Sequence, residues 1–315
     1  MLGLVGRRLA MSVALVFVAS ALTFVLVSVT PGDPVTTLLG GDQQARAEDV
    51  ERLREDLGLN ESVVDRYTDW LGNALNGDLG ESVITGQSVT EALNSRLSVT
   101  LNLIVVSLTL SAIVGVSLGV VSAIRRGALG KFTDVLSLGG LAIPSFWLGL
   151  VLVSIFAVKL GWFPANGFSP FSEGPLDWLK SITLPVMALF VGGIATISKQ
   201  TRNAMSEVLD SEFIRNLHAN GLPRRSIIFR HALRNAAIPV VTVLGLSFIG
   251  LLGGTVFIEQ LFVLPGLGNL AVNAVQSHDL PIVQGVVVYF VVIVAIVNLV
   301  IDLLYGWLNP KARLR

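Results

Sequence analysis

The feature that most constrains this chain is a set of six long stretches without a single Asp, Glu, Lys or Arg. They are 18 to 28 residues long, and a bilayer core needs roughly 20 apolar helical residues to cross it. Buried helices of soluble proteins are usually shorter and amphipathic. We therefore predict an all-α integral membrane protein with six transmembrane helices. The six stretches are Leu9–Val29, Leu97–Ile124, Val135–Val158, Ser181–Ser198, Asn235–Ile258 and Leu280–Ile301.

The composition agrees with a membrane protein and excludes several kinds of site. Hydrophobic residues make up 52% of the chain and charged residues 14%, against about 25% charged in an average soluble domain. The 22 basic and 22 acidic residues balance, so no nucleic-acid partner is expected. The chain has no cysteine, which excludes disulfides, thiolate metal sites and cysteine nucleophiles.

The charges between the stretches predict how the chain is oriented. If the N-terminus is cytoplasmic, the cytoplasmic segments hold 15 of the 22 Lys and Arg residues, and the outer segments hold 17 of the 22 Asp and Glu residues. This is the positive-inside pattern, and it places both termini in the cytoplasm. A cleaved signal peptide ending near Ala19-Ser20-Ala21 is the alternative for the first stretch, but its 21 uncharged residues exceed a usual signal core of about 7–15.

These boundaries divide the chain into four predicted parts. They are a first transmembrane helix (1–30), an extracytoplasmic subdomain (31–96), a five-helix core (97–308) that includes a cytoplasmic loop (199–234), and a cytoplasmic tail (309–315).

The outer segment 31–96 carries 13 acidic and 5 basic residues and is predicted to be a small helical subdomain. Glu48–Leu57 predicts a short charged helix. A second predicted helix has one apolar face, made of Val63, Val64, Tyr67, Trp70, Leu71, Ala74 and Leu75. This face either packs over the outer ends of the spans or also contacts an external partner through Tyr67, Trp70 and Leu71.

The loop Lys199–Arg234 is the only sizeable cytoplasmic surface. Asn203–Asn220 reads as helical, and Gly221 followed by Pro223 suits a helix C-terminus. A loop that only fixes topology or contacts anionic lipid is the simpler alternative.

Glycines and prolines predict local features of the helices and of the last outer segment. Pro265, Gly266 and Gly268 predict a tight re-entrant turn there. Four glycines have the spacing of close helix approach, namely Gly115, Gly119, Gly139 and Gly140. Three prolines are expected to kink helices or to stand at their ends, namely Pro144, Pro185 and Pro239.

The chain lacks the motifs of an energy source. It has no phosphate-binding G-x-x-x-x-G-K-[ST] motif, and no histidine lies within the six stretches to activate a serine. An ion-coupled carrier usually needs ionisable groups within the membrane, and the stretches contain none. A self-contained channel or ion-coupled secondary carrier therefore stands as the alternative to a passive subunit driven by other chains.

Two stretches of the cytoplasmic loop, Asp210–Pro223 and Arg230–Pro239, resemble the EAA loop of bacterial ABC importer permeases. The resemblance is nearest to the B-type permease subunit of the dipeptide/oligopeptide (peptide/nickel) transporters. Further matching motifs are Pro31–Pro34, Leu57–Leu59, Trp70–Gly72, Gly77–Gly80, Ile143–Gly149, Phe163-Pro164, Pro265–Gly268 and Asp302–Tyr305.

This resemblance implies a multi-pass protein of the bacterial cytoplasmic (inner) membrane that has no catalytic site and binds neither cofactor nor metal. It implies a second homologous permease subunit, two ABC ATPase subunits (or a fused pair) that bind ATP and Mg, and an extracytoplasmic solute-binding protein. The implied cargo is a dipeptide or oligopeptide.

The resemblance also implies that Glu212–Leu222 is a coupling helix that docks on the ATPase. The implied contact residues are Glu212, Phe213, Arg215, Asn216, Leu217, His218, Ala219, Gly221 and Leu222. The sequence departs from the general motif, because Arg215-Asn216-Leu217 stands where Glu-Ala-Ala is usual.

Overall fold

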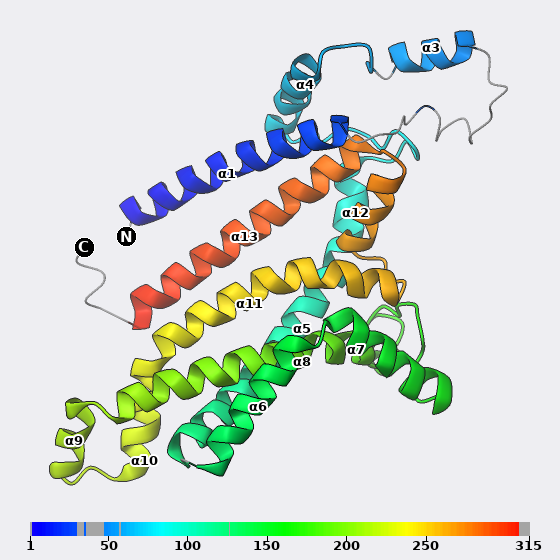
Figure 1. Ribbon diagram of the computed structural model, residues 1–315. Coiled ribbons are helices and arrows are strands. Elements are labelled where there is room, and N and C mark those ends of the chain that lie inside the picture. The colour runs from blue at the N-terminus through cyan, green and yellow to red at the C-terminus, as the bar shows by residue number, and fades with distance from the viewer. Residues whose placement is uncertain (1, 30–34, 36–46, 57, 126, 309–315) are drawn as a thin grey trace. The chain divides into compact units, whose positions relative to one another are not determined.

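The computed structural model describes residues 2–29, 35, 47–56, 58–125 and 127–308, and the regular secondary structure of these residues is helical (Figure 1). Glu81 and Ser88 form an isolated antiparallel bridge. The all-α prediction is confirmed. The helices are α1 (Leu2–Val29), α3 (Ala47–Asp56), α4 (Val63–Leu75), α5 (Val89–Ile124), α6 (Ala128–Ala142), α7 (Ser145–Leu152), η1 (Val153–Lys159), α8 (Pro175–Leu209), α9 (Glu212–Ala219), α10 (Arg224–Ser226), η2 (Ile227–Ala232), α11 (Leu233–Leu261), α12 (Leu267–Gln276) and α13 (Leu280–Leu308).

Within the described residues, five helical stretches are long and apolar enough to cross a membrane. Each contains one of the predicted spans. They are Gly6–Val29, Val89–Ile124, Pro175–Leu209, Arg224–Leu261 and Leu280–Trp307.

The prediction of one continuous span over Val135–Val158 is wrong. α6 ends before Ile143, whose backbone is extended, and Pro144 is the N-cap of α7. Proline disfavours the helical conformation of the residue before it, so the helix breaks here and a new one starts. Pro144 thus stands at a helix end, whereas Pro185 and Pro239 lie inside α8 and α11.

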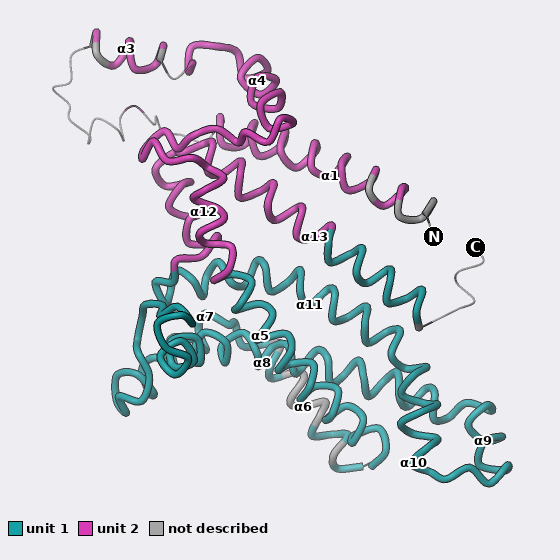
Figure 2. Tube along the Cα trace, turned by 180° about the vertical axis from the view of Figure 1, so that it is seen from behind, with its two compact units in different colours: residues 1, 100–264, 296–315 teal, residues 2–99, 265–295 magenta. Residues whose placement is uncertain are grey.

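The chain folds into two compact units (Figure 2). Of the described residues, unit 1 holds 100–125, 127–264 and 296–308, and unit 2 holds 2–29, 35, 47–56, 58–99 and 265–295. The described residues of the predicted subdomain 31–96 are therefore grouped with α1 and with a distant segment of the chain. α5 and α13 each begin in unit 2 and continue into unit 1.

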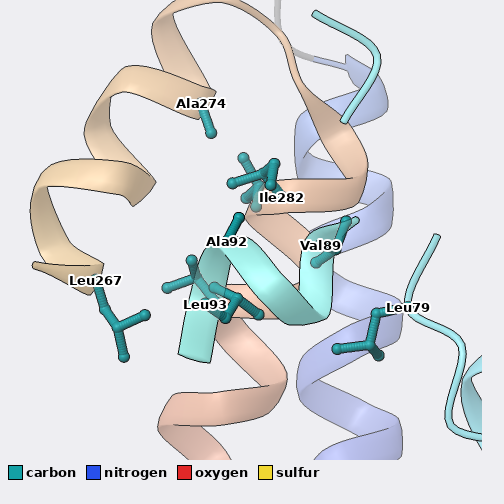
Figure 3. Packing of buried hydrophobic residues seen from close by; sticks show 9 residues of the cluster. Leu79, Val89, Ala92, Leu93, Leu267, Ala274 and Ile282 are labelled. Carbon is teal, nitrogen blue, oxygen red and sulfur yellow. The ribbon is translucent and has the colours of Figure 1, made fainter. Parts of the chain in front are cut away.

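Unit 2 is built on an apolar cluster in which α5, α12 and the start of α13 meet (Figure 3). Its buried members are Leu79, Val89, Ala92, Leu93, Leu267, Ala274, Ile282, Val283 and Val286. A buried polar contact joins the same region, because the Ser82 hydroxyl donates to the Asp279 carboxylate at 2.5 Å. α4 packs on α1.

In unit 1, α8 contacts α6, α7 and α11, and glycines allow close approach. A Cβ on Gly119 would lie 2.6 Å from the Thr201 Cβ and 2.7 Å from the Ser198 carbonyl oxygen. Gly115 and Gly140 approach α8 in the same way. A Cβ on Gly139 would meet no described atom within 4 Å, so within the described residues the prediction of close approach is confirmed for three glycines and wrong for Gly139.

Candidate functional site

The segment predicted to couple to an ATPase forms the separate short helix α9. The expected continuous helix over Asn203–Asn220 is wrong, because α8 ends at Leu209 and α9 begins at Glu212. Between them Ser211 is extended, and its hydroxyl donates to the Val208 carbonyl at 2.6 Å. Such local side-chain bonds offer the backbone an alternative to continuing the helix.

α9 ends in a complete Schellman motif. The N–H of Gly221 donates to the His218 carbonyl at 3.0 Å, and the N–H of Leu222 donates to the Leu217 carbonyl at 3.2 Å. Gly221 has φ +75°, a conformation that glycine adopts without penalty. The predicted helix end at Gly221 is confirmed, and the sharp turn lets the chain double back into α10.

One face of α9 packs against the rest of unit 1. Ile214 is buried, and Leu217 and Leu222 are half-buried. They join a set of side chains that we call the α9 cluster. Its buried members are Val120, Ala123, Ala204, Met205, Ile214, Ile227, Ile228, Ala232 and Ala236. Leu217 therefore fills this cluster, which accounts for a bulky residue where the general motif has alanine.

The other face of α9 is exposed. Seven of the nine predicted contact residues are exposed, namely Glu212, Phe213, Arg215, Asn216, His218, Ala219 and Gly221. The structure thus separates the predicted set into an exposed group and two anchoring leucines. Ile214, which the sequence reasoning missed, is the most buried residue of the helix. In the sequence, the indication that Ile214 is buried was its i, i+3 spacing with Leu217.

The α9 cluster joins α9 to several long helices. Its members come from α5, α8, α9, η2 and α11, and α9 and α10 lie at one end of α8 (Figure 1). Close-packed interiors transmit displacement. A force applied to α9 would therefore act on the helices that the cluster joins.

Polar and aromatic contacts hold the exposed face in place. The Phe213 ring meets the His231 ring edge-to-face, with centroids 6.3 Å apart. His218 Nδ1 lies 3.0 Å from the Ile214 carbonyl oxygen. Glu212 in the first turn and His218 in the last turn suit the helix dipole. A cavity of about 310 Å³ lies beside Ile214 and His218.

The second predicted set, on α4, packs within unit 2. Tyr67, Trp70 and Leu71 are half-buried. The Tyr67 hydroxyl is 2.9 Å from the Ser20 hydroxyl, and the Tyr67 and Trp70 rings stack with centroids 6.1 Å apart. These side chains belong to unit 2, whereas α9 belongs to unit 1.

Sequence reasoning also missed a buried acid. Glu259 lies in the last turn of α11 with no exposed surface, and the Thr100 hydroxyl donates to its Oε1 at 2.7 Å. In the sequence, the only indication that Glu259 is buried was its position directly after the fifth uncharged stretch. Among the described residues, no group of three or more His, Cys, Asp or Glu could hold a metal ion.

Curated relatives match the chain over nearly its full length. A protein of Brucella abortus named for a peptide transport system permease is 40% identical over 99% of both chains. The oligopeptide transport system permease protein AppB of Bacillus subtilis is 36% identical over 97% of both. The glutathione transport system permease protein GsiC of Escherichia coli is 33% identical over 99% of both.

A solved structure and two family models agree with these relatives. The inward-facing MetNI methionine ABC transporter matches with a TM-score of 0.58 at 18% identity, covering 70% of this chain and 97% of that one. This likeness shows the fold. Residues 1–104 match the N-terminal model, and residues 115–314 match the main model, of one family. The chain belongs to the inner membrane components of binding-protein-dependent transport systems.

Proposed function

We propose that this chain is one of two permease subunits of an ATP-driven importer of short peptides, and that α9 is its coupling helix. The relatives named for peptide, oligopeptide and glutathione transport support the cargo class. The chain supplies no ATPase site. Separate subunits bind ATP and Mg, a second permease completes the pathway, and an extracytoplasmic binding protein delivers the peptide.

The observation that carries the coupling role is the two-faced packing of α9. One face is exposed over a full turn and more, and the other is anchored in the α9 cluster. An ATPase that grips the exposed face moves α9 as a rigid body, and the cluster passes this movement to α5, α8 and α11. ATP shifts the transporter because it binds one arrangement of the ATPases better than the other.

Single-cysteine cross-linking tests this role directly, because the chain has no cysteine of its own. Ala219→Cys places a thiol on the exposed face of α9, and Gln87→Cys places one on an exposed loop of unit 2. In the assembled transporter we expect Ala219→Cys to cross-link to a cysteine in the ATPase groove, and Gln87→Cys to give no such product.

Reconstitution tests the energy source. Vesicles that contain this chain, the second permease and the ATPases are expected to accumulate a tripeptide only with ATP and binding protein. Accumulation by this chain alone under a proton or sodium gradient would favour the secondary carrier instead. An absent cross-link at Ala219 in a transporter that works normally would remove the coupling role.

A further inference from the structure

The helix break at Ile143 and Pro144 lies within a predicted membrane span and has no part in the coupling role of α9. Before the break, α6 has 15 residues; after it, α7 and η1 have 8 and 7. Each piece is shorter than the roughly 20 residues that a bilayer crossing needs. The positive-inside pattern puts the two ends of this stretch on opposite sides of the membrane. The two pieces therefore cross it together, with the break inside.

Packing contacts within unit 1 place the break at membrane depth. Before the break, a Cβ on Gly140 would lie 2.7 Å from the Ala195 Cβ, which belongs to the fourth uncharged stretch. After the break, a Cβ on Gly149 would lie 3.6 Å from Ile258 Cδ1, at the end of the fifth uncharged stretch. Both neighbours lie in long continuous helices, α8 and α11. The break lies between these two levels and is therefore flanked by membrane spans.

The break leaves backbone N–H groups without helical partners. The first bonded N–H of α7 is that of Leu148, which donates to the Pro144 carbonyl at 3.1 Å. No side chain caps the helix, so the N–H groups of Ser145, Phe146 and Trp147 have no partner within it. The described part of the chain supplies no partner from another element either.

The described residues also leave the break uncovered. Ile143, Pro144, Phe146 and Trp147 are exposed, and 51% of the Trp147 surface is accessible. Irregular backbone at membrane depth does not face lipid, because hydrocarbon offers no hydrogen bonds. It is tolerated only inside protein or beside a water-filled cavity. The exposed side of the break therefore faces protein or water in the assembled transporter.

Water is the better partner of the two. The carbonyl groups of a second helical permease are bonded within its own helices at this depth, so such a neighbour has few acceptors for the free N–H groups. Water supplies them freely. Transporters place their substrate sites near the bilayer midplane at interrupted helices of this kind.

The side chains around the break suit a passing peptide. The Phe146 ring lies 6.5 Å from the Phe257 ring of α11, between centroids, and both side chains are exposed. Aromatic walls with a few hydrogen-bonding groups are typical of ligand sites. The stretch Val135–Val158 has no charged residue, so this wall has no ionic group that would hold one end of a peptide.

We propose that Ile143–Trp147 and Phe257 form part of the wall of the water-filled pathway through which the cargo crosses the membrane. Water pairs with the free N–H groups of the break, and the carbonyl groups of a passing peptide replace that water. The identity of the cargo rests on the proposed function. The contact of the break with water does not.

Single-cysteine labelling tests the contact with water, because the chain has no cysteine of its own. Ser145→Cys exchanges one oxygen for sulfur at the break. Val18→Cys is the matched control, on the exposed surface of the unbroken helix α1. In the transporter assembled with cysteine-free partners in lipid nanodiscs, a charged methanethiosulfonate should modify Ser145→Cys at least about 10-fold faster, because apolar surroundings raise the pKa of a thiol and remove the reactive thiolate.

Two labelling results would overturn the proposal. If Ser145→Cys stays unmodified in a transporter that still imports peptide, the break is buried against the second permease. If Ser145→Cys and Val18→Cys react at equal rates, the break is no more hydrated than an unbroken helix in lipid.

The same modification tests whether the cargo passes the break. The modified Ser145→Cys transporter should lose most of its peptide uptake, because the added group narrows the pathway. Dithiothreitol reduces the mixed disulfide and should restore uptake, which separates a blocked pathway from an unfolded protein. Full uptake by the modified Ser145→Cys transporter would show that the pathway runs elsewhere.

The failure of this inference and the failure of the proposed function have different signatures. If the assembled transporter does not accumulate a tripeptide while Ser145→Cys is labelled and Val18→Cys is not, the cargo assignment fails and the hydrated break remains. If the tripeptide accumulates while Ser145→Cys stays unlabelled, the importer stands and only the assignment of the pathway fails.

Discussion

The proposed coupling role of α9 depends on the left-handed backbone conformation of Gly221, which ends the helix. Its φ of +75° closes the Schellman motif of α9, and no atom lies within 4 Å of the position of a Cβ there. Gly221→Ala therefore adds strain without a clash, and the left-handed conformation costs about 1–2 kcal/mol. We expect the end of α9 to fray and ATP-dependent uptake by the reconstituted transporter to fall several-fold.

Gly77 is the matched control for this variant. It has φ +88° and open space around it, and it ends α4 in the same motif, with its N–H donating to Ala74 and that of Asp78 to Asn73. Gly77→Ala should cost similar stability in a thermal-unfolding measurement. If both variants lost uptake equally, the effect would be one of stability and not of coupling at α9.

The Thr100–Glu259 contact predicts that removing the buried Thr100 hydroxyl destabilises the protein. Thr100→Val keeps the shape of the side chain and removes the donor to Glu259 Oε1. The variant should lower the free energy of unfolding by about 1–3 kcal/mol, because the buried carboxyl loses a partner. Thermal unfolding in detergent measures this effect.

Thr183→Val is the comparison for Thr100→Val. The Thr183 hydroxyl donates to the Leu179 carbonyl of its own helix and is exposed, so its removal should change the unfolding temperature little. Equal unfolding temperatures for Thr100→Val and the unmodified protein would show that the Thr100–Glu259 contact contributes nothing to stability.

The packing of α5 on α8 is set by small residues. Gly119→Ala would press a methyl group onto Thr201 and the Ser198 carbonyl, and overpacking costs about 1–3 kcal/mol. Gly139→Ala meets open space inside α6, so it should gain up to about 1 kcal/mol of helix propensity. We expect the unfolding temperatures of the two variants to move in opposite directions. A shift of the same sign in both would contradict this account of the helix contact.

Membrane orientation is a property of the whole molecule, and thiol labelling tests it. The positive-inside pattern puts α9 in the cytoplasm and residues 58–88 outside. In intact cells, a membrane-impermeant maleimide should label Gln87→Cys and leave Ala219→Cys unlabelled until the membrane is permeabilised. Labelling of Ala219→Cys from outside would reverse the predicted topology and remove α9 from reach of a cytoplasmic ATPase.

Much of the architecture follows from local rules. Five of the six uncharged stretches are helices, because an apolar chain in a bilayer satisfies its backbone groups only within helices. The α4 helix follows from its apolar spacing, and the end of α9 follows from Gly221, because both signals are carried by neighbouring residues. The family resemblance pointed to the proposed coupling segment for the same reason, since its motif is contiguous in sequence.

Only tertiary structure decided the features that depend on distant residues. The pairing of Thr100 with Glu259 and the cavity beside Trp70 and Gln284 join segments far apart in the chain, which no local pattern encodes. Backbone context also overrode residue preference at Val263, which has φ +50° at the end of α11. Two backbone bonds close the helix end there, from the N–H of Val263 to the Gln260 carbonyl and from the N–H of Leu264 to the Glu259 carbonyl. The surrounding structure thereby outweighs the local cost of a β-branched residue in this conformation.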